Sequence, residues 1–201
     1  GKVIIISMYY IVGLGNPGEE YKLSRHNTGR IIVEDFRRNE KFGDFEIDKK
    51  INALASEGKI KKEKAILIMP ETFMNKSGLS LKNLITSKKK AENLVVIHDD
   101  VDLPLGRAKI SFGSGSGGHK GVEAIMRAIK TKDFVRVRVG ISPTTPSGKI
   151  KKPESKKMGD FILGNFTPKE QTIIKKESKK ITSAIEAIVG GGREKAMNLF
   201  N

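Results

Sequence analysis

The amino-acid sequence predicts a single α/β domain built on a mixed, largely parallel, twisted sheet flanked by helices. Three observations support this prediction. Short apolar runs alternate along the chain with segments whose apolar residues recur at helical spacing. Residues 94–98 form a continuous apolar run bounded by acidic residues, which is typical of a central strand buried on both faces. The length of 201 residues suits one domain with a substantial core.

In the first half of the chain, apolar runs and amphipathic segments alternate. Strands are predicted at residues 9–14, 53–60, 65–69 and 94–98. Helices are predicted at residues 28–42 and 74–85, where apolar side chains gather on one side of a 3.6-residue period. The lysine run at residues 88–90 is expected in a loop or at a helix end. Residues 1–8 are expected to be an N-terminal extension or the start of the first strand, and residues 9–201 the single domain.

The second half begins with a predicted strand at residues 107–112, followed by a glycine-rich loop and a helix at residues 121–129. Residues 134–141 alternate valine with Arg136 and Arg138, which predicts a half-buried strand with one cationic face. Residues 142–159 are rich in Pro, Ser and Lys and are predicted to be a mobile basic loop.

The remaining sequence predicts two helices. Thr167 and Glu170 form a capping box with Pro168 at the first helical position. The helix that this box opens is expected to end at residues 190–192. A short terminal helix is expected at residues 196–200.

The composition is strongly basic, with 38 Lys and Arg against 23 Asp and Glu and a formal net charge of +15. Residues 101–201 hold 20 of these cations against 9 acids, so the basic face is expected mainly from the second half. A polyanion is the expected partner, because clustered cations release counterions from nucleic-acid phosphates; the alternative is an ordinary solvated surface. The absence of cysteine excludes disulfides, thiolate metal sites and a Cys nucleophile. Residues 3–12 are too short an apolar run to span a membrane.

Residues 12–29, VGLGNPGEEYKLSRHNTG, hold the densest group of turn-forming and polar residues. Two interpretations compete. Residues 13–18 match the dinucleotide fingerprint G-x-G-x-x-G, as residues 113–118 do. The first match is disfavoured because Pro17 lacks a backbone donor and two glutamates follow it, beside the place where a phosphate would lie. Neither match has an obvious ribose-binding acid.

The other interpretation is a hydrolytic centre. His26 is one of three histidines, and a general base near neutral pH is most often histidine. Asp99 and Asp100 follow the buried strand and can orient such a base, while Asn16 and Asn75 can hold a carbonyl. Together they suit hydrolysis of an acyl ester by water. The plainer interpretations remain: a core role for His98, packing for Met74, a turn for Asn16 and a helix cap for Asn27 and Thr28.

Several motifs, in order, resemble the bacterial-type peptidyl-tRNA hydrolase family. They include GLGNPG and RHNTG within residues 13–29, PETFMNKSG at residues 70–78, HDDVDLPLGRAKI at residues 98–110 and GSGGHKG at residues 115–121. The similarity continues through FVRVRVGI, GDFILGNF and the final AMNLFN, so that it extends over residues 9–201. This resemblance implies cleavage of the ester between a peptide and the 3′ ribose of tRNA, with no metal required. We expect a cytoplasmic protein without a cofactor, and a monomer, since catalysis at the end of an acceptor stem needs an open cleft. The alternative is a non-catalytic RNA-binding protein on the same fold.

The resemblance also implies roles for individual residues. His26 activates water and Asp99 orients and polarises it. Substrate-binding roles are implied for Asn16, Tyr21, Met74 and Asn75.

The chain departs from the family pattern at two places. Lys120 stands where the family usually has Asn, and Ser111 where it tends to have a basic residue that grips the tRNA 5′-phosphate. We therefore hypothesise that the phosphate is held by Lys109, Lys120 and Arg136, with Lys120 also among the substrate-binding residues.

Overall fold

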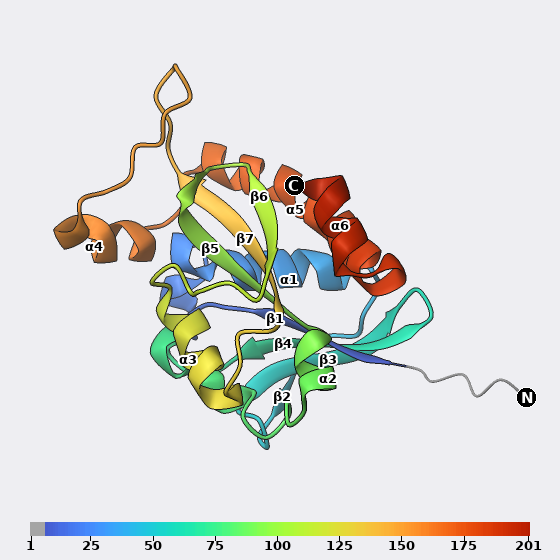
Figure 1. The fold of residues 1–201 in the computed structure, drawn as a ribbon. Helices are drawn as coiled ribbons and strands as arrows, with labels where there is room; N and C mark the ends of the chain where they lie inside the picture. The colour runs from blue at the N-terminus through green and yellow to red at the C-terminus, as the bar shows by residue number, and fades with distance from the viewer. Residues whose placement is uncertain (1–6) are drawn as a thin grey trace, which may run out of the picture.

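The structure is a computed structural model that describes residues 7–201, and its centre is one seven-stranded sheet in the order β2-β3-β4-β1-β5-β7-β6 (Figure 1). The strands are β1 (Met8–Gly13), β2 (Glu46–Asp48), β3 (Ala53–Ile60), β4 (Glu63–Pro70), β5 (Leu94–Pro104), β6 (Ala108–Phe112) and β7 (Val135–Ser142). The four central strands β4, β1, β5 and β7 are parallel, whereas β2, β3 and β6 join antiparallel at the edges. The predicted mixed sheet with a parallel centre is confirmed.

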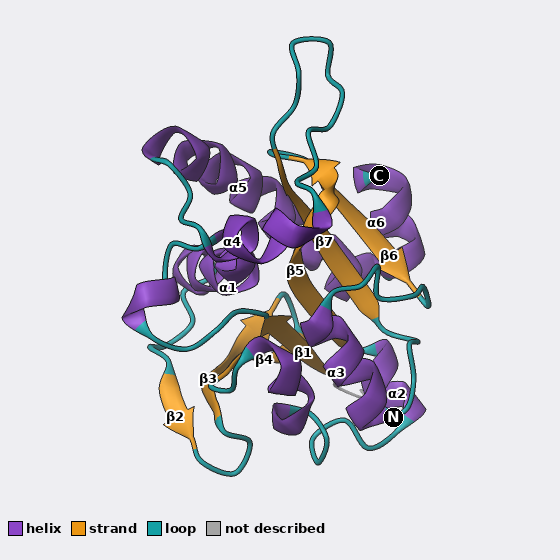
Figure 2. Cartoon of the chain, turned by 90° about the vertical axis from the view of Figure 1, so that its left-hand side faces the viewer, coloured by secondary structure: helices purple, strands orange, loops and turns teal. Residues whose placement is uncertain are grey.

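Helices cover both faces of this sheet (Figures 1 and 2). One face packs against α1 (Thr28–Asn39), α5 (Pro168–Gly191) and α6 (Arg193–Phe200). The other packs against the 3₁₀ helix η3 (Met74–Ser80), α2 (Lys88–Glu92) and α3 (Lys120–Ile129). Ile11 belongs to the first core and its neighbour Val12 to the second, because successive strand residues point to opposite faces. Within residues 7–201, no helix has the length and apolar character needed to cross a membrane.

The predicted elements differ from the structure mainly at their ends. Strand β5 continues six residues past the predicted end, to Pro104. The predicted helix 74–85 is a 3₁₀ helix that ends at Ser80, and the lysine run forms α2, which Ser87 caps through its side chain. The short edge strand β2 was not predicted, because three exposed or half-buried residues give no apolar signal. Of the predicted extension or strand start at residues 1–8, residues 1–6 lie outside the described residues, and β1 begins at Met8.

Strand β7 corrects the prediction of a half-buried strand. It lies between β5 and β6, and its side chains are buried except for Arg138, which is half-buried. Arg136 is only 4% exposed. The segment that follows β7 projects from the body as a loop (Figure 2). The last part of the predicted loop at residues 142–159 is helical, because η4 (Ser155–Lys157) and the start of α4 (Met158–Leu163) lie there.

The capping box that opens α5 is confirmed. The Thr167 hydroxyl accepts a hydrogen bond from the Glu170 backbone N–H at 3.3 Å, and the Glu170 carboxylate accepts one from the Thr167 N–H at 2.7 Å. Four isoleucines at helical spacing along α5 are buried in the core that packs on the sheet: Ile174, Ile181, Ile185 and Ile188. The predicted C-terminal helix is α6, which begins three residues earlier than expected.

Glycines let the start of α1 touch the sheet. A Cβ on Gly29 would lie 2.2 Å from the Ile97 carbonyl oxygen and 2.5 Å from the Leu14 nitrogen. A Cβ on Gly13 would lie 2.4 Å from the Gly29 carbonyl oxygen. The glycines of residues 13–29 therefore serve a close contact between backbones, which brings the segment before α1 to the carboxyl ends of β1 and β5.

Replacing Gly29 tests this contact. We expect Gly29→Ala to lower the free energy of unfolding by about 1–3 kcal/mol, because the methyl group has no space beside Ile97. Gly43→Ala is the matched control, since its Cβ would meet no heavy atom within 4 Å, and we expect a change within about 0.5 kcal/mol. Chemical denaturation measures both values, and equal losses in the two variants would contradict the account.

Candidate active site

A pocket of about 550 Å³ lies at the carboxyl ends of the central strands. This is where open α/β sheets place their ligand sites. Its wall is formed by residue 16 after β1, residue 26, residues 73–75, residues 98–101 of β5, residues 116–120 at the start of α3 and several residues of η4 and α4. Most of the residues predicted for the site therefore meet here, although they come from distant parts of the chain.

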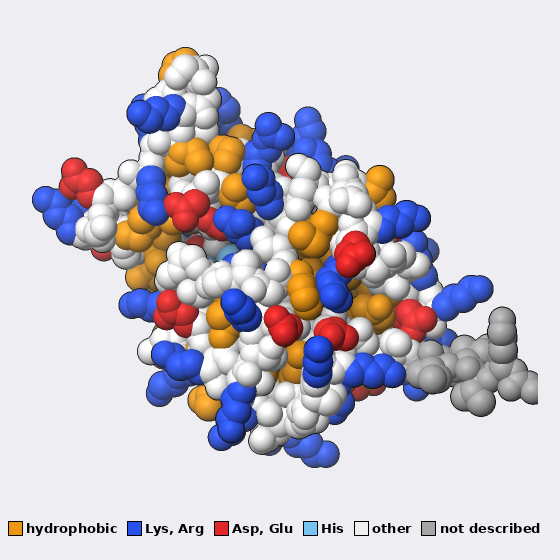
Figure 3. All heavy atoms as spheres, viewed as in Figure 1, with side chains coloured by type: hydrophobic (Ala, Val, Ile, Leu, Met, Phe, Trp, Pro, Cys, Tyr) orange, Lys and Arg blue, Asp and Glu red, His pale blue; other side chains and the backbone are white. Residues whose placement is uncertain are grey.

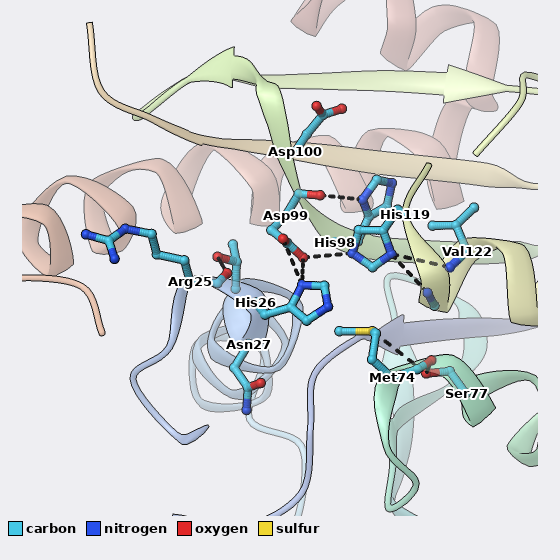
Figure 4. Close-up of polar contacts among 12 residues, drawn as sticks. Arg25, His26, Asn27, Met74, Ser77, His98, Asp99, Asp100, His119 and Val122 are labelled. Atoms are coloured by element: carbon cyan, nitrogen blue, oxygen red, sulfur yellow. Dashed lines mark hydrogen bonds and ion pairs between the residues drawn. The ribbon is translucent and has the colours of Figure 1, made fainter. Parts of the chain in front are cut away.

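His26 and Asp99 form the centre of the site (Figure 4). His26 lies on the 3₁₀ helix η2 (Arg25–Asn27) and is 7% exposed, while Asp99 is 3% exposed on β5. The His26 Nδ1 atom lies 2.9 Å and 3.1 Å from the two carboxylate oxygens of Asp99. Because an ionised carboxylate only accepts hydrogen bonds, Nδ1 carries the proton, and Nε2 keeps a free lone pair on the far side of the ring.

His119 makes a second hydrogen bond to the same carboxylate. Its Nε2 atom lies 2.8 Å from Asp99 Oδ1. Its Nδ1 atom accepts from the backbone N–H groups of Gly121 and Val122 at 3.2 and 3.4 Å, as the N-cap of α3. The proton of a neutral His119 is therefore on Nε2, which donates to Asp99. Burial opposes the charge of Asp99, but the two histidines outweigh it and hold the pKa of this carboxyl well below its usual range.

His98 lies behind this pair and is 1% exposed. Its Nδ1–H donates to the Asp99 backbone carbonyl at 2.7 Å, and its Nε2 accepts from the Arg136 guanidinium at 3.1 Å. The bond from Arg136 requires the neutral ring, because a protonated Nε2 has no lone pair to accept it. Burial, His119 and Arg136 hold the pKa of His98 well below its ordinary value. His98 is thus buried, as the plainer interpretation expected, and it also contacts the backbone of Asp99.

Asn16 is held with its amide oriented. Its Oδ1 atom accepts from the Met74 backbone N–H at 2.8 Å, which leaves the Nδ2 amino group as the donor available to the pocket. Asn27 does not cap α1 with its side chain as the plainer interpretation expected. Its amide instead exchanges two hydrogen bonds with the Asn16 backbone, at 2.8 and 2.9 Å. Asn27 thus fixes the position of Asn16.

The other predicted substrate-binding residues fall in different places. Met74 is buried beside His26 (Figure 4), and both Asn75 and Lys120 are exposed residues of the pocket wall. Tyr21 ends the 3₁₀ helix η1 (Glu19–Tyr21), half-buried, and does not line the pocket. Asp100 lines the pocket but points away from Asp99, and its carboxylate pairs with Arg138 at 2.7 Å.

Arg136 does not lie where the phosphate hypothesis requires. It is buried, and its guanidinium contacts His98, Ser114 and Gly115 rather than a surface. The register pairs Lys109 with Arg138 and Ser111 with Arg136. Exposed Lys109 therefore has the half-buried Arg138, and not Arg136, as its cross-strand neighbour.

The wall formed by α4 is attached to η2 through Arg25. The Arg25 guanidinium pairs with Glu170 at 3.1 Å and lies 4.6 Å from the centre of the Phe161 ring. Its backbone N–H donates to the Gly164 carbonyl at 3.0 Å. Arg25, which directly precedes His26, thus attaches the wall formed by α4 to the helix that carries His26.

Three side chains of this site have potential metal-ligand atoms that lie close together. The ligand atoms of His26, Asp99 and His119 lie within 4.8 Å of one another. The Nδ1 atom of His119 accepts two backbone hydrogen bonds, so Nε2 keeps its proton and lacks a lone pair for a metal. The arrangement favours a hydrogen-bonded His–Asp–His chain.

Sequence reasoning missed the contact of His119 with Asp99. One signal was present: a histidine lies two residues before the predicted start of the helix at residues 121–129, close to the N-cap position where Ser, Thr, Asp or Asn is usual. A histidine at that position has one nitrogen committed to the cap and the other directed elsewhere.

The fold and the site together define an α/β-domain protein with a buried carboxylate–histidine pair that opens onto a pocket. Comparison with known proteins gives the family. The family model described as peptidyl-tRNA hydrolase matches residues 10–201. The chain belongs to the peptidyl-tRNA hydrolase family.

Similar proteins span nearly the whole chain. The peptidyl-tRNA hydrolase of Thermodesulfovibrio yellowstonii is 36% identical over 197 residues, which cover 96% of this chain and 99% of that protein. That of Fervidobacterium nodosum is 39% identical over 191 residues, covering 95% and 94%. The crystal structure of peptidyl-tRNA hydrolase from Acinetobacter baumannii matches with a TM-score of 0.85 at 29% identity, covering 96% of this chain and 94% of that one.

The buried neutral His98 predicts a pH dependence of stability. Its pKa in the folded state is lowered, whereas an unfolded histidine titrates near about 6.5. Below about pH 6.5 His98 binds a proton in the unfolded chain but not in the folded protein. The stabilisation that a neutral His98 provides is therefore complete above this pH and is lost as the pH falls.

We expect the free energy of unfolding to decrease as the pH falls below about 6.5. His98 should contribute up to about 1.4 kcal/mol per pH unit to this decrease. In His98→Asn this contribution is absent, so the variant's stability should decline less steeply between about pH 7 and 5. Denaturant titrations at several pH values measure the slope. Identical slopes in the two proteins would contradict the assignment of a neutral His98.

Proposed function

We propose that this chain hydrolyses the ester between a peptide and the 3′ ribose of tRNA, with His26 as the general base. The observation that carries the proposal is the hydrogen bond between His26 Nδ1 and Asp99, at 2.9 Å. Because Nδ1 carries the proton of this bond, Nε2 has the lone pair that is available to a water in the pocket. The family membership of the chain supports the substrate class.

The proposed reaction needs no covalent intermediate. His26 Nε2 takes a proton from water as its oxygen forms a bond to the ester carbonyl carbon. The Asn16 Nδ2 group donates to the oxygen that becomes negative, and the proton on His26 then passes to the departing ribose oxygen as the ester bond breaks. A positioned base contributes about 10²–10⁴-fold, and an oxyanion donor about 10²–10³-fold. Asp99 remains ionised and stabilises the imidazolium while it lasts.

We propose that the enzyme acts as a cytoplasmic monomer that binds the acceptor stem and 3′ end of tRNA. The net charge of +15 supports a nucleic-acid partner. Lys and Arg side chains are spread over the face in Figure 3, interspersed with acidic ones, rather than gathered into one block. The phosphate-binding hypothesis now includes Lys109 and Lys120 with Arg138 in place of Arg136. In this scheme Tyr21 and Asn75 remain predicted substrate contacts.

Removing the base tests the activity. We expect the parent protein to hydrolyse N-acetyl-aminoacyl-tRNA, and His26→Ala to lower kcat by about 10²–10⁴-fold. Asp99→Asn should also lower kcat strongly. The carboxylate accepts hydrogen bonds from both histidines, whereas an amide has one oxygen, and its NH₂ group would face one of the two rings. Release of the blocked amino acid measures turnover. A parent protein that binds tRNA without hydrolysing it would instead support the RNA-binding alternative.

Salt dependence tests the phosphate contacts. We expect Lys120→Ala and Lys109→Ala each to raise KM, and to reduce the slope of log KM against log salt by about 0.7–0.9, the value for one lost phosphate contact. Lys62→Ala is the control, since this exposed lysine lies in the turn between β3 and β4, at the opposite end of the sheet. If Lys120→Ala behaves like Lys62→Ala, Lys120 does not bind phosphate.

A further inference from the structure

The segment that leads to His119 is rich in glycine. Residues 113–118 include four glycines, and Gly113, Gly117 and Gly118 have positive φ angles of 65, 64 and 82°. Glycine loses more conformational entropy on ordering than any other residue. A hydrogen bond from His119 to Asp99 therefore requires that something else fixes the start of this segment.

Arg136 provides that attachment. One of its guanidinium nitrogens donates to the Ser114 hydroxyl at 2.8 Å and to the Gly115 carbonyl at 2.5 Å. The other donates to His98 Nε2 at 3.1 Å. The far end of the segment is fixed by His119 itself, which caps α3. The glycine-rich segment is thus held at both ends.

These contacts close a ring around Asp99. His98 donates to the Asp99 backbone carbonyl and accepts from Arg136, and Arg136 holds the segment that carries His119. His119 then donates to the Asp99 side chain. Both the backbone and the carboxylate of Asp99 are therefore positioned through the same chain of residues (Figure 4 draws its His98, Asp99 and His119 part).

Burying Arg136 is energetically costly. Its side chain belongs to a residue that is 4% exposed, and among the described residues it forms no salt bridge with a carboxylate. Burial, and the repulsion of Arg138, lower the pKa of Arg136. A buried charge without a paired carboxylate destabilises a fold unless its hydrogen bonds compensate. An apolar side chain would suit stability better at this place in a buried strand, which indicates a role in the site.

We infer that Arg136 and His98 are positioning residues for the hydrolysis proposed above. They fix the glycine-rich segment so that the His119 N–H reaches Asp99, which in turn holds the His26 imidazole. Neither residue touches the reacting atoms. The inference rests on the proposed roles of His26 and Asp99, and it replaces the hypothesis that Arg136 binds phosphate.

Kinetics distinguish positioning from phosphate binding. We expect Arg136→Met to lower kcat by roughly 10- to 100-fold, the effect of misplacing a catalytic group by about 1 Å. The salt dependence of KM should be unchanged, and Arg136→Lys should recover part of the loss. Arg138→Met is the matched control, two residues along the same strand, and should mainly raise KM and reduce its salt dependence. If Arg136→Met instead behaves like the control, with kcat within twofold of the parent, the inference is wrong.

The imidazole protons give a second, independent readout. The chain has three histidines, so ¹⁵N-histidine spectra contain three rings that single substitutions can assign. We expect a protonated Nε2 on His119 in the parent protein, and loss of that ordered N–H in Arg136→Met. An unchanged His119 signal in the variant would overturn the inference, because the ring would then hold its position without Arg136.

Ser114→Ala keeps the test decisive if Arg136→Met does not fold. Removal of one hydrogen bond to Arg136 at an exposed residue should lower kcat by about three- to tenfold. A kcat equal to that of the parent would contradict the inference. Failure of the proposed function is a separate outcome, since the parent protein itself would then not hydrolyse the ester.

Discussion

The arrangement of the site depends on one buried carboxylate that is shared by two histidines. Asp99 accepts from His26 at 2.9 Å and from His119 at 2.8 Å, and burial removes the water that would otherwise compete for its oxygens. In a medium of low dielectric these charge-assisted bonds are strong, and breaking either would leave a buried charge poorly paired. The carboxylate therefore selects one tautomer for each ring, and the free nitrogen of His26 follows from that selection.

The fold brings this carboxylate and its partners together through close backbone contacts. Asp99 lies on the central parallel strand β5, and Gly29 lets η2 and α1 approach the ends of β1 and β5. Arg25 then attaches the α4 wall to the same short helix that carries His26. A residue with a side chain at position 29 would push η2 away from the strand ends, and the His26–Asp99 distance would increase.

Much of the fold and many residues of the pocket could be predicted from the sequence, because they are determined by local patterns. The continuous apolar run of β5, the capping box of α5 and the motif residues of the pocket all have short-range signals. The missing parts depend on contacts between distant segments. Periodicity predicted a cationic face for β7, but β6 and the segment at residues 113–118 cover Arg136. His119 was not linked to Asp99 because no sequence spacing relates a helix cap to a strand end twenty residues away. Tyr21 belongs to the short helix η1, which the motif alone could not place relative to the pocket.

The central claim is that Asp99 fixes His26 with its proton on Nδ1, so that Nε2 is the base. The most direct measurement is the pair of ¹⁵N chemical shifts of the His26 ring. The account predicts a protonated Nδ1 and a bare Nε2 in the parent protein, and loss of that preference in Asp99→Asn. A His26 ring with its proton on Nε2 in the parent protein would contradict the account, because no lone pair would then face the substrate.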